Sequence, residues 1–323
     1  MPDSITITSL RFIDGNTGWA AGEIPRPILG GVACQQAPPI PSSPCYGVVL
    51  RTTDGGATWQ KTLLIPYPGT YPYPVLQIQA IDGLRAWALI EACAPPTGAD
   101  RPPLCGPTEI RRTVNGGTTW TTVIRDYIVA IRFATELWGW LVVQNADGSS
   151  EIRVTGDAGS SWRSVLRTTS GEVVGLDAAN ALTAWALTQD GGYCSATSCL
   201  KYELLRTIDG GATWSSLGNP KSETGSCVGG HLVGPLFASP NRGWLGENSG
   251  AGGALDVTGL LQTEDGGKSW GCSASPSETN LVSAADPEHV WVTSVSRAGW
   301  VTTLYSSNDA GASWHALDLR SVS

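Results

Sequence analysis

The hexapeptide Asp54-Gly-Gly-Ala-Thr-Trp59 recurs in six related copies along a chain of 323 residues, and this repetition decides the fold. The other copies run from Asn115 to Trp120, Asp157 to Trp162, Asp209 to Trp214, Asp265 to Trp270 and Asp309 to Trp314. An Asp or Asn side chain accepts hydrogen bonds from the amides of a turn, and Gly supplies the positive φ of a tight reversal. Because strand-like runs flank each copy, the hexapeptide predicts a turn between two antiparallel strands.

A second tryptophan precedes each hexapeptide and predicts a second strand pair in every repeat. These tryptophans are Trp19, Trp87, Trp140, Trp185, Trp244 and Trp291, so the two themes account for 12 of the 14 tryptophans. Each repeat then has four strands, which we name a to d, with the box turn (the hexapeptide) between c and d. Six such repeats predict an all-β, six-bladed β-propeller of four-stranded antiparallel blades. The predicted blades span approximately 5–65, 66–126, 127–168, 169–222, 223–276 and 277–323, as one domain.

Composition excludes several other classes of protein. The chain has 40 Gly, 21 Pro and only 15% charged residues, which argues against a helical bundle. A net charge of −8 argues against a nucleic-acid partner. No run approaches the roughly 18 apolar residues of a membrane span, so we expect no membrane insertion. We expect a monomer.

The hexapeptide with its preceding Ser or Thr resembles the Asp-box, or BNR, repeat, whose pattern is Ser/Thr-x-Asp-x-Gly-x-Thr/Ser-Trp. Only the second copy departs from it, with Asn115 in place of Asp. Together with Phe12-Ile-Asp-Gly-Asn-Thr-Gly-Trp19, the repeats are most similar to the photosystem II stability and assembly factor family. Sialidases and sortilin ectodomains share only the box. The resemblance implies structural box residues and, for the photosystem family, help in assembling a membrane complex.

The same resemblance implies features that this chain does not show. Propellers of the photosystem family are expected to have seven blades and a basic surface patch. This chain has six boxes and a net charge of −8. The assembly role is therefore one version of a scaffold function, to which the sequence does not commit.

Loop lengths distinguish the two faces of the predicted propeller. The a–b turns and box turns lie on one side, which we call the box face, and the b–c and d–a connections lie on the other, which we call the loop face. From the b-strand tryptophan to the box, 35 residues separate Trp19 from Asp54, whereas 17 separate Trp140 from Asp157. Long loops on a rigid scaffold often carry function. The loop face, with its insertions in blades 1 and 2, is the predicted functional face.

Cysteine positions predict an oxidising compartment. Three close pairs fall within the b–c insertions and predict the disulfides Cys34–Cys45, Cys93–Cys105 and Cys194–Cys199, which leaves Cys227–Cys272 for blade 5. Unpaired thiols or a zinc site are the alternatives, and the lack of a Cys-x-x-Cys motif argues against zinc. We therefore expect an extracellular or periplasmic protein, given as a mature chain without its signal peptide.

Aromatic residues on the loop face are the predicted ligand-binding residues. The proline-rich d–a connection after blade 1 presents Tyr67, Tyr71 and Tyr73, and Trp300 lies at the b–c tip of blade 6. Arg26 lies in the string nearest to the Arg-Ile-Pro motif of sialidases, although the order of residues differs. Preordered Tyr and Trp rings suit stacking on a sugar or contact with a peptide. The alternative is that these rings only cover the hairpins beneath them.

No catalytic constellation is evident, and the sequence indicates neither a metal site nor a cofactor. The acidic residues expected near the loop face show no paired spacing: Glu23, Glu91, Asp100, Asp126, Glu172, Asp190, Glu223 and Glu247. The primary hypothesis is thus a non-catalytic binding or assembly scaffold that presents the loop face to a protein or glycan. The alternative is a sialidase-like glycoside hydrolase whose carboxylates converge only in three dimensions.

Overall fold

The computed structural model describes residues 5–24, 46–66, 75–91, 93–94, 104–169, 171–190, 201–221, 231–248, 260–276, 279–296 and 301–317. All regular structure in these residues is β-strand, arranged in six four-stranded antiparallel sheets and one two-stranded sheet. Within the same residues no helix has the length and apolarity that a membrane crossing needs.

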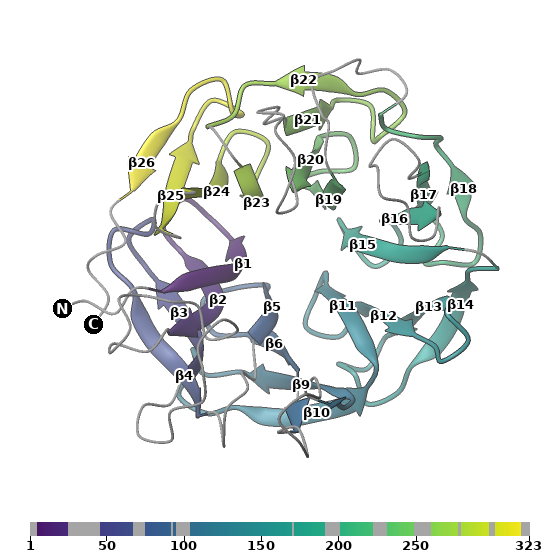
Figure 1. The fold of residues 1–323 in the computed structure, drawn as a ribbon, viewed down its shortest axis with the longest axis horizontal. Coiled ribbons are helices and arrows are strands. Elements are labelled where there is room, and N and C mark those ends of the chain that lie inside the picture. Colours follow the sequence, from purple (N-terminus) through teal and green to yellow (C-terminus); the bar gives the residue numbers. More distant parts are fainter. Residues whose placement is uncertain are drawn as a thin grey trace. The chain divides into compact units, whose positions relative to one another are not determined.

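Each four-stranded sheet is one blade, labelled in Figure 1. Blade 1 contains β1 (Thr6–Phe12), β2 (Gly18–Ile24), β3 (Tyr46–Thr52) and β4 (Gln60–Pro66). Blade 2 contains β5 (Val75–Ala80), β6 (Ala86–Ile90), β9 (Thr108–Thr113) and β10 (Thr121–Asp126). Blade 3 contains β11 (Ile128–Phe133), β12 (Gly139–Gln144), β13 (Ser150–Thr155) and β14 (Arg163–Arg167).

The remaining blades follow the same plan. Blade 4 contains β15 (Glu172–Ala178), β16 (Ala184–Asp190), β17 (Lys201–Thr207) and β18 (Ser215–Ser216). Blade 5 contains β19 (His231–Phe237), β20 (Gly243–Asn248), β21 (Leu260–Thr263) and β22 (Gly271–Ser273). Blade 6 contains β23 (Thr279–Ala284), β24 (Val290–Ser296), β25 (Val301–Ser307) and β26 (His315–Leu317).

The fold is an all-β, six-bladed propeller of four-stranded antiparallel blades, as the repeats predict. In blade 2 the insertion between strands b and c adds the two-stranded sheet of β7 (Cys93–Ala94) and β8 (Leu104–Cys105). The chain forms two compact units, which divide the strands of blade 6 between them. The first comprises Met1–Ile128, Val295–Leu304 and Leu317–Ser323, and the second comprises Val129–Ser294 and Tyr305–Ala316.

The residue that ends strand a and the residue that begins strand b are of two kinds, which alternate from blade to blade. In blades 1, 3 and 5, strand a ends on Phe and strand b begins with Gly. A Cβ on Gly139 would lie 2.5 Å from the ring of Phe133, so the ring fills the space that glycine leaves. Blades 2, 4 and 6 instead end strand a with Ala80, Ala178 and Ala284. All three phenylalanines of the chain serve this one purpose.

The box tryptophans of blades 1, 3 and 5 pack within their own blade. Each indole N–H donates to the carbonyl of the third box residue, at 3.0 Å from Trp59 and 3.1 Å from Trp162 and Trp270. Each ring also stands edge-on to the Phe of its blade, with centroids 6.0–6.3 Å apart. In these blades the box tryptophan therefore packs against the box turn and the Phe of the same blade.

The box tryptophans of blades 2, 4 and 6 pack against the preceding blade instead. Trp120 donates to the carbonyl of Thr62 in blade 1 at 3.3 Å. Trp214 of blade 4 stands edge-on to Trp140 of blade 3, with centroids 6.0 Å apart. The indole of Trp314 likewise donates to a backbone carbonyl of blade 5. The structural repeat is therefore a pair of blades rather than a single blade.

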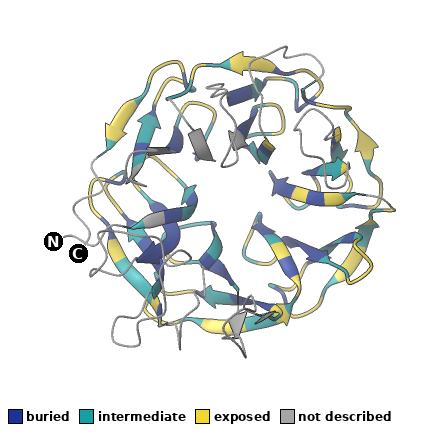
Figure 2. Ribbon diagram, viewed as in Figure 1, coloured by how far each residue is buried: buried dark blue, intermediate teal, exposed yellow. Residues whose placement is uncertain are grey.

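The tryptophans of strand b form the buried layer of the blades. All six are at most 3% exposed, whereas the d strands are largely exposed (Figure 2). The strand register pairs Trp19 with Arg51 and Trp185 with Arg206, and each guanidinium lies over its indole ring. Several arginines ahead of the box turns thus support the blade by cation–π contacts.

A buried ion pair joins the innermost strands of blades 3 and 4. Arg132 of β11 and Asp177 of β15 are 5% and 2% exposed, and their side chains form an ion pair. Asp177 also accepts the backbone N–H of Phe237, at the end of β19, at 2.5 Å. One carboxylate therefore ties together three successive blades of the second unit.

Candidate functional site

Every side chain predicted to bind a ligand lies outside the described residues. This holds for Arg26, Tyr67, Tyr71, Tyr73 and Trp300. The site can therefore be built only from the strand ends and turns that support it.

The box turn is held by a fixed set of side-chain hydrogen bonds. In blade 3, Asp157 Oδ1 accepts the Thr155 hydroxyl at 2.7 Å and the Ser161 N–H at 2.8 Å, while Oδ2 accepts the Ser161 hydroxyl at 2.6 Å. Thr155 Oγ1 in turn accepts the N–H of Gly159 at 2.9 Å. Boxes 1, 4, 5 and 6 repeat these contacts. The box carboxylates are therefore committed to turn structure.

Asn115 makes the same turn without a charge. Its Oδ1 accepts the Thr113 hydroxyl and the Thr119 N–H, both at 3.0 Å. Its Nδ2 donates to the Thr119 hydroxyl at 2.9 Å, which reverses the direction of that bond compared with the five turns that hold Asp at this position. Blade 2 is thus a natural uncharged version of the box.

These contacts predict a stability that falls in acid. Hydrogen bonds from Ser161, Thr213 and Ser313 lower the pKa of Asp157, Asp209 and Asp309 to about 2, well below the ordinary value of an aspartate. The unfolded chain therefore takes up protons first, so stability is fully present above about pH 4 and is lost as the pH falls toward 2. Thermal melts across this range should show a smaller slope for Asp157→Asn and a larger slope for Asn115→Asp. Equal slopes for both variants and wild type would contradict this assignment.

Two carboxylates occupy the same position at the loop-face ends of neighbouring b strands. Glu23 and Glu91 each lie four residues after the b-strand tryptophan of blades 1 and 2. Glu23 is 5% exposed, and partial burial raises the pKa of Glu91. Side chains alternate between the two faces of a strand, so Glu23 lies on the same face as Ala21, which packs against blade 2. Glu91 follows the alternation of Leu89, and it therefore lies on the face of blade 2 that points away from blade 1. The two carboxylates therefore do not form a pair.

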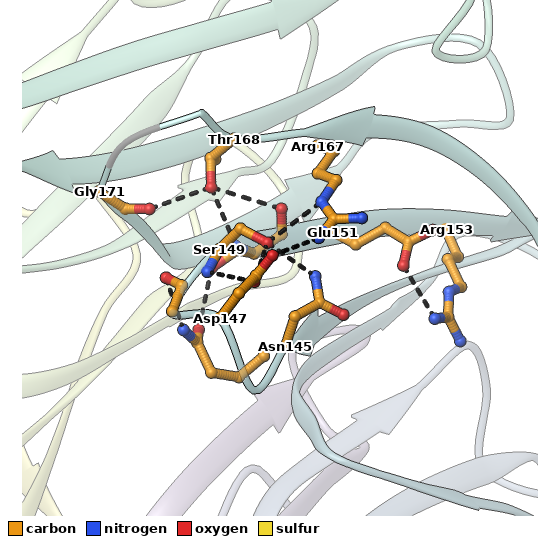
Figure 3. Close-up of polar contacts among 11 residues, drawn as sticks. Asn145, Asp147, Ser149, Glu151, Arg153, Arg167, Thr168 and Gly171 are labelled. Atoms are coloured by element: carbon orange, nitrogen blue, oxygen red, sulfur yellow. Dashed lines mark hydrogen bonds and ion pairs between the residues drawn. The ribbon is translucent and has the colours of Figure 1, made fainter.

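The b–c connection of blade 3 has no long insertion and forms a short hairpin held by polar contacts (Figure 3). Asp147 accepts the hydroxyl and the N–H of Ser149 at 2.6 and 3.0 Å and pairs with Arg167 at 2.6 Å. The Ser149 hydrogen bonds, and then Arg167, lower the pKa of Asp147 to about 2. Asp147 therefore stays ionised at neutral pH and does not act as a general acid there.

The outer strands of blades 2 and 3 carry equivalent charged clusters. Glu109 forms ion pairs with Arg111 and Arg125, the latter at 2.7 Å, and Glu151 pairs with Arg153 at 2.8 Å. Burial raises the pKa of Glu109, but hydrogen bonds from the two arginines outweigh it and hold the pKa below its usual range. Among the described carboxylates with a resolved pKa shift, Glu91 alone is shifted upward. The described loop face thus offers one candidate acid, Glu91, and Glu23 is not its partner.

Only three of the eight cysteines of the predicted disulfides lie among the described residues. Cys93 and Cys105 lie directly opposite each other in the two-stranded sheet of β7 and β8. Cys272 of β22 is disulfide-bonded. Cys34, Cys45, Cys194, Cys199 and Cys227 lie outside the described residues. The proposed pairings remain predictions.

No protein-family model matches the sequence, and no curated protein matches it. Solved structures share the fold at low identity. YCF48 bound to a D1 peptide is 17% identical with a TM-score of 0.50, over 98% of this chain and 82% of that chain. An α-L-arabinofuranosidase from Fusarium graminearum, bound to an iminosugar inhibitor, is 12% identical with a TM-score of 0.56, over 95% and 96%.

A sialidase from Trypanosoma rangeli in complex with sialic acid is also similar. It is 12% identical with a TM-score of 0.53, over 95% of this chain and 54% of that chain. Similarity at this level shows the fold alone. Proteins of this fold thus include one that binds a peptide and others named as glycosidases, so fold does not choose between binding and hydrolysis.

Proposed function

We propose that the chain is a non-catalytic binding or assembly scaffold that presents its loop face to a protein or glycan. The observation that carries the proposal is the arrangement of carboxylates on the described part of that face. Glu91 has a raised pKa, but it leaves the face of blade 2 that points away from blade 1, whereas Glu23, its equivalent in blade 1, lies on the face of blade 1 that packs against blade 2. A glycosidase needs two carboxylates that face each other across one bond.

The proposal includes a family and a compartment. The hydrogen-bonded turns support their assignment as Asp boxes of the BNR type, and we propose that the chain is related to the photosystem II stability and assembly factor family. The predicted disulfides support an extracellular or periplasmic location. Alkylation of the unfolded, unreduced protein is expected to find no free thiol, and any labelled cysteine would contradict this part of the proposal.

The binding residues are proposed to be the tyrosines and tryptophan that the sequence places on the loop face. Replacing Tyr67, Tyr71 and Tyr73 together with serine removes three rings without shortening the connection between β4 and β5. We expect this variant to lose binding to ligands found on glycan and peptide arrays, since aromatic rings supply most of such contact energy. The matched control is Tyr127→Ser, which removes a 57% exposed ring from the next d–a connection.

The two variants separate the proposal from general surface effects. Loss of binding in the triple variant with retention in Tyr127→Ser supports it. Equal binding by the triple variant and wild type, or equal loss in both variants, contradicts it. Deletion of residues 28–45 between β2 and β3 provides a second test of the same face, because it removes the largest insertion and both members of the pair Cys34 and Cys45.

A further inference from the structure

The a–b turns of blades 3, 4 and 5 leave the second unit on the same side. Asp177 lies one residue before the end of β15, and it contacts Arg132 near the end of β11 and Phe237 at the end of β19. Because these three strand ends meet at one carboxylate, the turns that follow them emerge together. This side is the box face of the second unit.

On this face each a–b turn is bonded to the box turn of its own blade. The N–H of Ala158 donates to the carbonyl of Leu137, and the N–H of Gly210 donates to that of Leu182, both at 2.9 Å. The other blades make the same bond with the carbonyls of Asn16, Leu84, Asn241 and Glu288. One residue of every a–b turn and the residue before the box Asp or Asn therefore occupy equivalent positions in all six blades.

Blades 3 and 4 fill these positions with exposed apolar side chains. Leu137 is 53% exposed, Leu182 is 56% exposed and Ile208 is 66% exposed. In blade 3 the residue before the box is Gly156, and Trp138, 39% exposed, covers it at 3.5 Å from where a Cβ would stand. We call Leu137, Trp138, Leu182 and Ile208 the apolar box patch.

The patch is specific to certain blades rather than general to the fold. Blades 5 and 6 hold Asn241 with Glu264, and Glu288 with Asn308, at the same positions. In the first unit, blade 2 repeats the apolar choice with Leu84 and Val114, which are 53% and 54% exposed. A single exposed leucine is ordinary, but exposed apolar side chains at equivalent positions of consecutive blades are typical of interaction sites.

The charges beside the patch are acidic. In residues 134–138, 156–161, 179–183 and 208–213, which form the four turns, the charged side chains are Glu136, Asp157 and Asp209. Both box aspartates have a pKa of about 2, lowered first by hydrogen bonds from Ser161 and Thr213, so they are ionised at neutral pH. Arg206, just before the second box, stacks over Trp185 and donates to the carbonyl of Pro240.

We propose that the apolar box patch is a docking site for a peptide segment that combines apolar with basic side chains. The apolar side chains of such a segment cover Leu137, Trp138, Leu182 and Ile208, and its basic side chains face the three carboxylates. An anionic membrane surface fits less well, because the same carboxylates repel its headgroups. The site lies on the opposite side of the blades from the loop face, and it does not depend on the function proposed for that face.

The test is selection of peptides on the full-length protein. A phage library of random dodecapeptides is selected on the wild type, and the enriched peptides are synthesised with a fluorescent label. We expect enriched peptides to contain Leu, Ile, Phe or Trp together with Lys or Arg, and to bind more weakly as salt increases. The variant Leu137→Asn, Leu182→Asn, Ile208→Asn is expected to bind them about tenfold more weakly or worse.

Matched variants make the result decisive. Asn is one of the two residue types that blades 5 and 6 hold at these positions, the other being Glu, and the control Asn241→Ser, Asn308→Ser changes the polar blades instead. Glu136→Lys tests the charge at an exposed turn residue and is expected to weaken binding with less dependence on salt. Melting temperatures equal to that of the wild type show that the variants are folded. If the triple variant does not fold, Glu136→Lys still tests the proposal.

Several outcomes would overturn the proposal. These are no enrichment, peptides that bind the wild type and both patch variants equally, and binding to phosphatidylglycerol vesicles without peptide binding. Peptides that survive the patch variants but are lost in the loop-face tyrosine variant would overturn this proposal while supporting the proposed function. Loss in the patch variants alone supports the apolar box patch as the peptide site and does not bear on the loop face.

Discussion

Replacement of Asp177 by alanine is expected to lower the free energy of unfolding by about 3–5 kcal/mol, as for other broken buried ion pairs. The substitution leaves the guanidinium of Arg132 buried without its carboxylate, and it removes the acceptor of the Phe237 N–H. Both groups belong to innermost strands, so blades 3, 4 and 5 are loosened together. Urea unfolding followed by tryptophan fluorescence measures the change.

Two controls identify burial as the cause. Asp147→Ala breaks the ion pair with Arg167, in which both side chains are 58% exposed, and should leave the unfolding midpoint nearly unchanged. The double variant Arg132→Met, Asp177→Leu removes both buried charges and should recover most of the loss. A loss in Asp177→Ala no larger than that in Asp147→Ala would contradict the role assigned to this pair.

The second large effect is expected at the alternating pair of strands a and b. Phe133→Ala should cost about 3–5 kcal/mol, because it empties a buried site and removes the edge-on contact with Trp162. Gly139→Ala alone should cost about 1–3 kcal/mol, because its Cβ would lie 2.5 Å from the Phe133 ring. Chemical unfolding of the single and double variants measures both terms.

The double variant Phe133→Ala, Gly139→Ala is the informative one. It gives blade 3 the Ala–Ala pair that blade 4 has at Ala178 and Ala184. We expect its loss to be smaller than the sum of the two single losses by more than about 0.5 kcal/mol, the usual limit for independent sites. Val129→Ala, on the same strand but 48% exposed, is the control and should change stability little. Additive losses would contradict the alternation of two kinds of blade.

Much of this architecture is determined by interactions between residues that are close in the sequence. Box turns, strand pairs and the order of blades follow from hydrogen bonding of Asp, Gly and Thr within a few residues, and such contacts can be deduced from a repeat. The stacking of Arg51 on Trp19 was within reach as well, because the register of a hairpin places them opposite each other. Local rules thus specify each blade.

The features that could not be predicted from the sequence depend on contacts between blades. The pairing of Arg132 with Asp177 joins residues of different repeats, and nothing in their spacing marks them. The alternation of Phe133 with Ala178 was visible in the three phenylalanines, but its meaning required the packing of Trp162 and Trp214. The apolar box patch was hidden for another reason: its leucines occupy turn positions whose equivalence appears only through backbone hydrogen bonds.

The candidate site was predictable only in its general location. Insertion lengths indicate the loop face, and the end of β6 brings Glu91 to it with a raised pKa. The same insertions have no repeat to guide them, since neither turn chemistry nor strand register fixes a long loop. The roles of Tyr67 and Trp300 therefore remain proposals.

In the proposed function, the loop face binds its ligand without changing it. The most direct test incubates the protein with the array ligand that it binds most tightly and determines the mass and quantity of that ligand by mass spectrometry. We expect saturable binding, lost in the Tyr67→Ser, Tyr71→Ser, Tyr73→Ser variant, with the ligand recovered intact. Progressive cleavage of a glycan by the wild type, abolished in Glu91→Gln, would contradict the claim and identify the protein as a hydrolase.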